Sequence, residues 1–386
     1  MNLFPNQDAA ANSRPVDPSA IDWRSLLALF LGSRLLIWAV AGVSLAVVEK
    51  GQFFTPPAGP ADWFMRWDAV FYEGLAAHGY SYDPGAGSTN VVFLPALPLL
   101  IRAVSLGGLI DFRIGGYLVS LACLWIACVW LWRAVAREWN DPRLATLAVA
   151  FLLLGPVSFF FSCLYSEALF LPLAIGCVDA ARQDRWWRAG ILGALAALTR
   201  FVGVILLVPL LWQYLESMFR GGSRSRPKSA VLLACFLPVA GFLVFCGFLW
   251  VRFGDPLLYF HAENFWGRHF AWFWDLLYRE SFSNQPLFYR IWFSATLATA
   301  FGVLLAGVLL RMPVAYSLFA LAAAGVYISA RLVESLPRYF SVLFPLYVAL
   351  ALVGRRWPRT VLPLLATSTA LLIFSVVLFV NGYWFT

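Results

Sequence analysis

The sequence predicts an all-α polytopic membrane protein, and three observations support this prediction. Of the 386 residues, 61% are hydrophobic and 12% are charged, about half the charged share of an average soluble domain. The apolar residues gather in stretches close to the roughly 20 residues that a helix needs to cross a bilayer. The charges lie mostly between those stretches. They are too few to cover a soluble surface, which excludes a soluble enzyme, a nucleic-acid-binding domain and a disordered protein.

Nine apolar stretches are expected to cross the membrane as full helices. They are 25–48, 114–132, 143–163, 165–181, 229–251, 291–310, 312–330, 339–353 and 360–381. Two further stretches are interrupted, because 91–107 contains Pro95 and Pro98 and because Arg200 divides 189–215. Neither suits a straight span, since proline lacks a backbone N–H group and a charged side chain is costly in lipid.

The placement of the charges predicts which ends of the spans face the cytoplasm. Several spans are followed by short arginine-rich loops, which are typical of the cytoplasmic side. Two long loops, 49–90 and 252–290, hold nine of the 20 acidic residues and are expected outside. The arginine-rich loops and the long loops lie on opposite sides of the membrane throughout only if 91–107 is re-entrant and 189–215 is a half-span hairpin with Arg200 near its outward apex. The prediction is nine full spans plus this hairpin, or about 11 membrane helices.

Residues 22–386 are expected to form a single transmembrane domain. Residues 1–21 are polar and contain three prolines, so we expect a disordered cytoplasmic tail there. Both long loops are dense in aromatic residues, which predicts interfacial helices on the outer surface. An aromatic belt without further function is the alternative. The six cysteines lie in apolar runs and are expected to be free, buried thiols.

Two acidic residues are candidates for chemistry. Asp68 lies among bulky aromatic residues, and a partly dry environment suits a general base. A solvated loop aspartate paired with Arg66 is the alternative. Glu167 lies between two apolar spans, where an ionisable residue is a functional candidate. The alternative for Glu167 is a carboxylate at a helix start, stabilised by the helix dipole.

Four arginines lie where the surrounding sequence offers little to neutralise them. Arg34 falls within the first apolar stretch, while Arg200, Arg331 and Arg338 point toward the outer face in this topology. Each needs an acidic partner such as Glu334, or a phosphate. The sequence has no DxD motif and no histidine pair at ligand spacing, so no cofactor is expected and a divalent metal is not required, although use of one stays open.

Six segments, in the same order over nearly the whole chain, resemble the PIG-V family of GPI mannosyltransferase 2 enzymes and their bacterial relatives. They are RWDAVFYEGLAAHGY, FLPALPLLIR, FFFSCLYSEALFL, LTRFVGVILLVPLL, FGDPLLYFHAENFWGR and SLPRYFSVLFPLYVALA. The resemblance implies a GT-C glycosyltransferase fold and an inverting transfer of a hexose, mannose above all. The donor would be a polyprenyl-phosphate sugar and the acceptor a glycan or glycolipid on the extracytoplasmic side. It further implies a protein of the bacterial inner membrane, or of the endoplasmic reticulum membrane if the source is eukaryotic.

The same resemblance implies roles for individual residues. Asp68 would be the base that activates the acceptor hydroxyl, and Glu167 falls on a YTE-like motif in which Ser166 replaces the threonine. The donor phosphate would be bound by Arg66, Arg200 and Arg338. Further substrate contacts are expected from Trp67, Tyr72, His78, Tyr165, His261, Trp266 and Arg268. The segment FLPALP departs from the family's FFPLYP and lacks one aromatic residue.

Two alternatives to a mannosyltransferase remain at the level of sequence. One is another GT-C transferase, with glucosyl, arabinosyl or protein O-mannosyl specificity, which composition does not separate from the first. The other is a lipid or solute transporter, which is expected to carry paired charges midway along several spans and often internal repeats. The expected spans here are nearly free of charge and the acids gather in the outer loops, which favours an enzyme.

Overall fold

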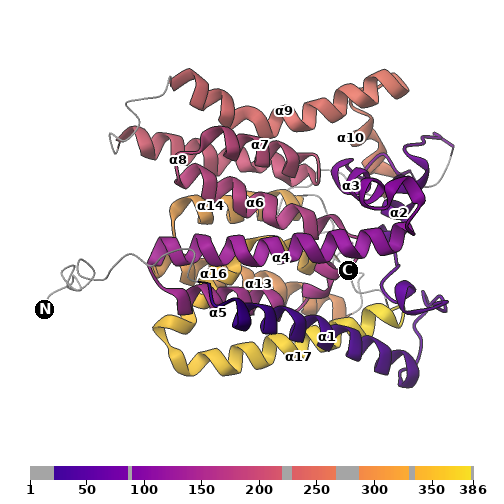
Figure 1. Cartoon of the computed structure of the whole chain (residues 1–386), viewed down its shortest axis with the longest axis horizontal. Coiled ribbons are helices and arrows are strands. Elements are labelled where there is room, and N and C mark those ends of the chain that lie inside the picture. Colours follow the sequence, from indigo (N-terminus) through magenta and orange to yellow (C-terminus); the bar gives the residue numbers. More distant parts are fainter. Residues whose placement is uncertain (1–20, 86–88, 220–227, 267–286, 330–334, 384–386) are drawn as a thin grey trace, which may run out of the picture.

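A computed structural model describes residues 21–85, 89–219, 228–266, 287–329 and 335–383. Every regular element in these ranges is a helix, and the long helices run in nearly the same direction along the molecule (Figure 1). The expectation of an all-α membrane protein is therefore confirmed. The expected tail at 1–20 and the part of the second long loop from 267 to 286, which includes Arg268, lie outside the described residues.

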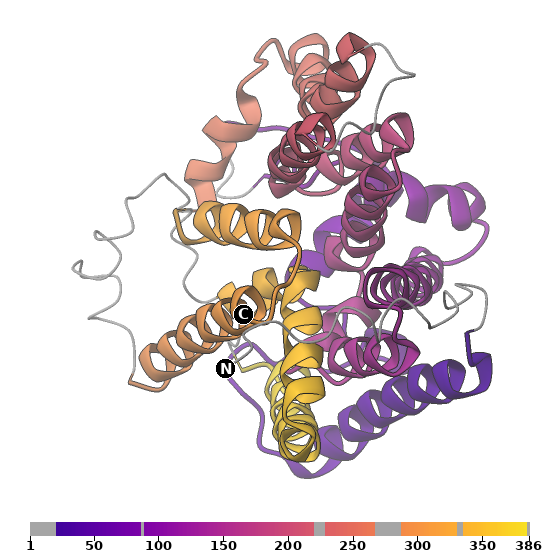
Figure 2. The same ribbon diagram turned by 90° about the vertical axis from the view of Figure 1, so that its left-hand side faces the viewer.

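Six helical segments in the described ranges are long and apolar enough to cross a bilayer by length and composition. They are α1 (Trp23–Val47), α4 (Phe112–Trp139), residues Phe201–Phe219, α9 (Lys228–Phe253), α13 (Leu287–Leu309) and the helix that includes α17 (Val361–Val380). The count of nine full spans plus a hairpin stays a prediction. Viewed from one end, α9 lies at one edge of the molecule, and α1 and α17 lie together at the opposite edge (Figure 2).

Two of the expected spans are broken into shorter helices. The stretch 143–163 contains α5 (Pro142–Leu153), which ends just before Gly155-Pro156, and the 3-10 turn η4 (Ser158–Ser162). The stretch 339–353 is divided between α15 (Leu336–Ser341) and α16 (Phe344–Arg356). Proline causes both breaks, since it has no N–H group to donate inside a helix and is tolerated in the first turn. The neighbouring α6 (Ser166–Arg182) and α14 (Val314–Ser329) match their predicted stretches closely.

The break after α5 explains how Arg34 is tolerated inside α1. Arg34 is 5% exposed. Its guanidinium donates to the backbone oxygens of Leu153 at 2.8 Å and Ser158 at 3.0 Å, and to Ser162 Oγ at 2.9 Å. The last carbonyls of a helix have no partner within it, so the end of α5 supplies acceptors for this buried cation. The partner of Arg34 is thus neither an acid nor a phosphate.

The two interrupted stretches meet at one end of the bundle. The segment 91–107 contains α3 (Ala96–Val104) and the start of the 3-10 turn η3 (Leu106–Gly108). The nine residues of α3 extend about 14 Å and do not cross a bilayer. The segment 189–215 forms α7 (Trp186–Ala197), η5 (Phe201–Leu206) and α8 (Leu207–Phe219), with Arg200 at the turn. Ala96 N donates to Leu198 O at 3.0 Å and joins α3 to this turn.

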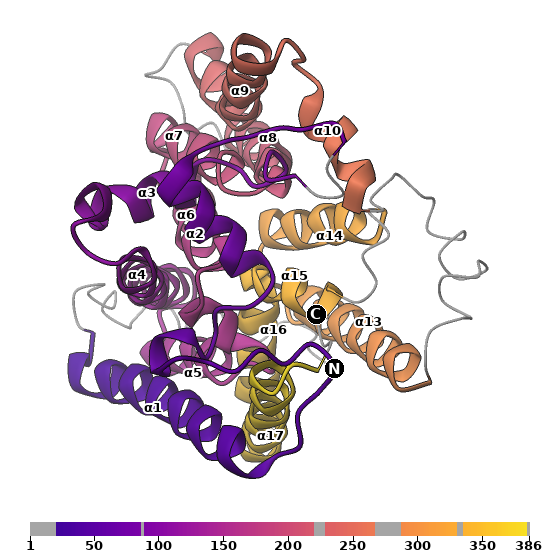
Figure 3. The ribbon, with the colours of Figure 1, turned by 90° about the vertical axis from the view of Figure 1, so that its right-hand side faces the viewer.

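The turn at Arg200 depends on a glycine. A Cβ atom on Gly203 would lie 2.4 Å from the carbonyl carbon of Ala196, so only glycine permits this close approach of η5 to α7. The same end of the bundle carries α2 (Asp68–His78) from the first long loop, and α10 (Leu258–Glu263) with η6 (Asn264–Trp266) from the second (Figure 3). Segments from the first long loop, the Arg200 turn and the second long loop therefore lie at the same end of the bundle.

Candidate active site

A cavity of about 740 Å³ opens between these segments, a volume within the range of small-molecule sites. Its walls come from α2, the segment before α3, the start of α6, the Arg200 turn, α10, η6, α14 and α15. The lining residues with polar side chains are Asp68, Tyr72, Ser166, Thr199, Arg200, Tyr259, Glu263, Asn264, Tyr327, Ser329, Arg338 and Tyr339. Apolar residues from the segment before α3, η5, α10 and α14 cover the remainder.

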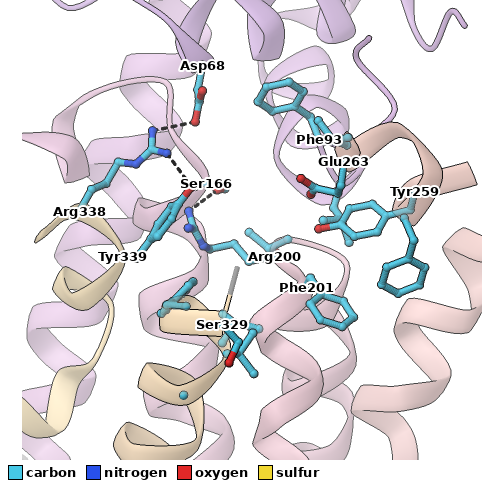
Figure 4. A pocket seen from close by; sticks show the side chains of 18 of the residues that line it. Asp68, Phe93, Ser166, Arg200, Phe201, Tyr259, Glu263, Ser329, Arg338 and Tyr339 are labelled. Atoms are coloured by element: carbon cyan, nitrogen blue, oxygen red, sulfur yellow. Dashed lines mark hydrogen bonds and ion pairs between the residues drawn. The ribbon is translucent and has the colours of Figure 1, made fainter. Parts of the chain in front are cut away.

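Asp68 occupies the first position of α2 and faces Arg338 on α15 (Figure 4). Arg338 Nη1 donates to Asp68 Oδ2 at 2.7 Å. The preceding residue, Trp67, has a positive φ of 48°, an uncommon conformation for a bulky residue that costs about 1–3 kcal/mol. The Asp68 side chain is 22% exposed, so a molecule in the cavity can reach it. The alternative that Asp68 pairs with Arg66 is wrong, because its partner is Arg338.

Glu167 lies behind the cavity and connects the two arginines. Its Oε1 atom is 2.6 Å from Arg200 Nη1 and 3.4 Å from Arg338 Nε. The side chain is 1% exposed and does not line the cavity. Arg200 also donates to Ser166 Oγ at 2.9 Å, and Arg338 donates to the hydroxyl of Tyr339 at 3.1 Å. This placement indicates that Glu167 positions both guanidinium groups and does not itself contact a ligand in the cavity.

The four charged groups at this site neutralise one another. Arg200 and Arg338 provide two positive charges, and Asp68 and Glu167 provide two negative charges. Arg200 and Arg338 thus have acidic partners, as one of the two expectations stated, while Arg331 and Glu334 lie outside the described residues. A buried cation needs such compensation. An incoming phosphate would compete with Asp68 for Arg338.

Arg66 is directed away from this cavity. The residue is 6% exposed. Its guanidinium donates to the backbone oxygens of Val380 at 2.8 Å, Thr55 at 3.3 Å and Phe53 at 3.5 Å. It does not line the cavity, and the structure therefore does not bring it together with the other two arginines. Its backbone oxygen accepts a hydrogen bond of 2.9 Å from the hydroxyl of Tyr165. Arg66 thus joins α17 to the segment that carries Asp68.

Of the predicted aromatic contacts, the structure places Tyr72 in the cavity wall. Burial raises the pKa of its hydroxyl, which interacts with Ser166. Tyr165 is buried, and the Arg338 guanidinium carbon lies 5.3 Å from its ring centroid. Trp67 packs edge-on against Phe379 at 4.8 Å. Neither Trp67 nor Tyr165 lines the cavity, so both support the residues around it.

Of the predicted residues of the second loop, His261 and Trp266 do not line the cavity, and Arg268 lies outside the described residues. The His261 side chain is 60% exposed, and its Nδ1 atom is 2.7 Å from Asp255 Oδ2. This hydrogen bond lowers the pKa of Asp255. Trp266 packs edge-on against Phe93, which itself lines the cavity. His78 ends α2, away from the lining residues.

Sequence reasoning missed several lining residues. Tyr339 directly follows Arg338 and could have been predicted, because the motif SLPRYF contains it. Glu263 lies in the quoted segment FGDPLLYFHAENFWGR, but an acid in a long polar loop gives no signal of its own. Within the described ranges, no three His, Cys, Asp or Glu side chains gather as a metal-binding group.

Comparison with known proteins identifies relatives of this chain. The family model "Mannosyltransferase (PIG-V)" matches residues 61–264. The chain is 32% identical to mouse GPI alpha-1,6-mannosyltransferase 2 over 169 residues, which are 39% of this chain and 33% of that protein. It is 32% identical to the rat enzyme over 214 residues, which are 49% of this chain and 42% of that protein. The chain thus spans between a third and a half of the length of these relatives.

Solved structures share the fold. ArnT from Cupriavidus metallidurans in the apo state superposes with a TM-score of 0.53 at 16% identity, over 93% of this chain and 74% of that chain. The structure of the same protein bound to undecaprenyl phosphate gives a TM-score of 0.52 at 14% identity, over 92% of this chain and 77% of that chain. At such identity the likeness concerns the fold alone. Since the family model covers more than half of the sequence, this chain belongs to the PIG-V mannosyltransferase family and has the GT-C fold.

Proposed function

We propose that this protein is a membrane glycosyltransferase that moves mannose from a polyprenyl-phosphate donor to a glycan or glycolipid acceptor, with inversion at the anomeric carbon. The observation that carries the proposal is the cavity in which one accessible carboxylate, Asp68, lies beside two guanidinium groups, Arg200 and Arg338. Family membership and the name of the mammalian relatives support mannose as the sugar. The lipid phosphate in the ArnT structure supports the donor class.

In the proposed reaction, Asp68 accepts the proton of an acceptor hydroxyl as that oxygen attacks the anomeric carbon. The new C–O bond forms on the face opposite the leaving group, and the bond between the anomeric carbon and the phosphate oxygen breaks. The electron pair of that bond leaves with the polyprenyl phosphate. Arg200 and Arg338 stabilise the negative charge that develops on the departing phosphate. Preorganised cations stabilise such charge in the transition state. Glu167 holds both arginines in position.

The two arginines supply the charge neutralisation that the leaving phosphate needs, so we propose that no divalent metal takes part. The apolar side chains that α14 and η5 contribute to the cavity suit the lipid end of the donor. We also propose that the cavity opens on the extracytoplasmic side of the bacterial inner membrane. In a eukaryotic cell the corresponding side is the lumen of the endoplasmic reticulum.

The decisive experiment uses purified protein in lipid nanodiscs. We expect transfer of labelled mannose from polyprenyl-phosphate-mannose to octyl α-mannoside, with an inverted anomeric configuration in the product by NMR. Faster transfer from polyprenyl-phosphate-glucose or -arabinose would instead assign the chain to another GT-C specificity. Absence of transfer, together with movement of the labelled lipid across the bilayer of sealed proteoliposomes, would favour a transporter.

A further inference from the structure

The charged side chains of the cavity lie on two separate walls. One wall carries Asp68, Arg200 and Arg338 with the hydroxyl groups of Ser166 and Tyr339. The other wall comes from the second long loop, where α10 ends at Glu263 (Figure 4). Figure 4 shows the Glu263 carboxylate directed into the pocket, across from Arg338. The two arginines and the Glu263 carboxylate therefore lie on different walls of the cavity.

This arrangement favours a ligand that carries an anionic group at one end and neutral hydroxyl groups at the other. An anionic group such as a phosphate is attracted by the arginines and repelled by a carboxylate. A carboxylate accepts hydrogen bonds and donates none. It therefore binds neutral hydroxyl groups well, through hydrogen bonds that its charge strengthens. A ligand with a phosphate at one end and hydroxyl groups at the other is held in one orientation.

Glu263 is mounted on a well-packed element. Leu258 and Ala262 on the same short helix are 2% and 0% exposed. Tyr259 lies face to face with Phe201, with ring centroids 5.8 Å apart, and both rings line the cavity. A residue fixed by such packing keeps the geometry that a specific hydrogen bond needs.

An aromatic surface lies close to the carboxylate. Phe93 lines the cavity and stacks on Phe71 with ring centroids 4.9 Å apart. Tyr72 meets the edge of Phe93 at 5.2 Å. Aromatic side chains offer a large apolar surface, which can cover the C–H face of a pyranose ring. A carboxylate beside an aromatic surface therefore matches the two kinds of surface that a sugar ring presents.

We propose that Glu263 binds hydroxyl groups of a sugar ring in this cavity and thereby determines which sugar the protein accepts. This inference rests on the proposed glycosyl transfer. The ring is either the hexose of the donor or the terminal sugar of the acceptor, and both present the same chemistry to Glu263. A site built to hydrogen-bond a hydroxyl group discriminates strongly against an analogue that lacks it.

The test compares Glu263→Ala and Glu263→Gln with Glu49→Gln, an exposed glutamate after α1 that lies outside the cavity. For polyprenyl-phosphate-mannose and octyl α-mannoside we expect kcat/KM to fall about 10- to 100-fold in Glu263→Ala, the loss typical of a hydrogen bond to a charged group. Glu263→Gln keeps one acceptor oxygen and loses less. The control retains wild-type values. A higher KM for the donor assigns the contact to the transferred hexose, and a higher KM for the acceptor assigns it to the acceptor ring.

Monodeoxy substrates give the sharper measurement. Removal of the hydroxyl group that Glu263 binds should lower wild-type kcat/KM about 10- to 100-fold and should leave the already impaired Glu263→Ala variant nearly unchanged. Removal of other hydroxyl groups should affect both proteins equally. Equal losses for every monodeoxy substrate, or a Glu263→Ala variant with wild-type kinetics, would overturn the inference.

A binding measurement separates this inference from the proposed function. If the wild-type protein transfers no mannose, the proposed function fails, and binding of polyprenyl-phosphate-mannose, polyprenyl phosphate and octyl α-mannoside is measured instead. Loss of affinity in Glu263→Ala for a sugar-bearing ligand, but not for polyprenyl phosphate, still supports sugar binding by Glu263. Unchanged affinity for all three ligands overturns it.

Discussion

Arg338 Nη1 donates a hydrogen bond of 2.7 Å to Asp68 Oδ2, across 270 positions of sequence. The proposed base and a proposed phosphate-binding group are therefore partners before any substrate is present. In the proposed reaction, a donor phosphate at Arg338 would take over part of the positive charge that pairs with Asp68. Donor binding would then free the carboxylate to accept the proton of the acceptor hydroxyl.

Arg338→Lys is expected to lower kcat/KM by about 10²- to 10³-fold, the usual loss when one preorganised donor is removed from the site of charge development. The guanidinium contacts Asp68, Glu167 and Tyr339 at once, and an ammonium group does not reproduce that planar fork. Steady-state transfer kinetics check the prediction. Arg143→Lys, an exposed arginine near the start of α5, is the matched control, and an equal loss in that variant would contradict the assignment.

Glu167→Gln is expected to weaken both the fold and donor binding. Breaking a buried ion pair from one side costs roughly 3–5 kcal/mol, because the remaining charge is left uncompensated. Arg200 and Arg338 both lose the carboxylate that they share. We expect a lower melting temperature and a higher Kd for polyprenyl phosphate. A folded Glu167→Gln variant with normal lipid affinity but no transfer would instead make Glu167 a direct participant in the chemistry.

Arg66→Lys is expected to lower the melting temperature without weakening phosphate binding. The Arg66 guanidinium donates to three backbone carbonyls, one of them at the end of α17, and an ammonium group keeps fewer of these contacts. Each lost hydrogen bond of this kind costs about 1 kcal/mol. Thermal unfolding and lipid-phosphate affinity are measured on the same preparation. A marked rise in Kd for polyprenyl phosphate would instead show that Arg66 takes part in binding the donor phosphate.

Removal of divalent metal with EDTA is expected to leave transfer unchanged. Two guanidinium groups face the position proposed for the phosphate, and their charge suffices to neutralise a departing phosphate monoester. Activity is compared before and after dialysis against EDTA, and again after addition of Mg²⁺ or Mn²⁺. Loss of activity that a metal ion restores would show that a metal shares this task.

The sequence identifies much of this site because charges in apolar surroundings need partners. Asp68, Glu167, Arg200 and Arg338 stand out for that reason, and all four come together in the structure. Their pairing is not readable from sequence, since proximity along the chain favoured Arg66 as the partner of Asp68. Arg66 also shows that a buried cation can use backbone carbonyls alone, a solution that leaves no trace in the residue pattern.

The helices follow the apolar pattern except where proline interrupts it. Pro156 and Pro345 lie in continuous apolar runs, so hydrophobicity alone predicted single spans where the structure has breaks. Both breaks have consequences for function. The first break provides backbone carbonyls that accept hydrogen bonds from Arg34. The second break separates α16 from the short helix α15, which carries Arg338. Glu263 was not predicted from the sequence, because its proposed role depends on the side chains that lie across the cavity from it.

The central claim is that Asp68 is the base of a glycosyl transfer and competes with the donor phosphate for Arg338. The most direct measurement determines, for Asp68→Asn, both mannose transfer from polyprenyl-phosphate-mannose and the affinity for polyprenyl phosphate. The control is Asp83→Asn, an exposed aspartate between α2 and α3. We predict that transfer falls about 10²- to 10⁴-fold, the usual contribution of a general base, while lipid-phosphate affinity is retained or rises. Full transfer activity in a folded Asp68→Asn variant would contradict the claim.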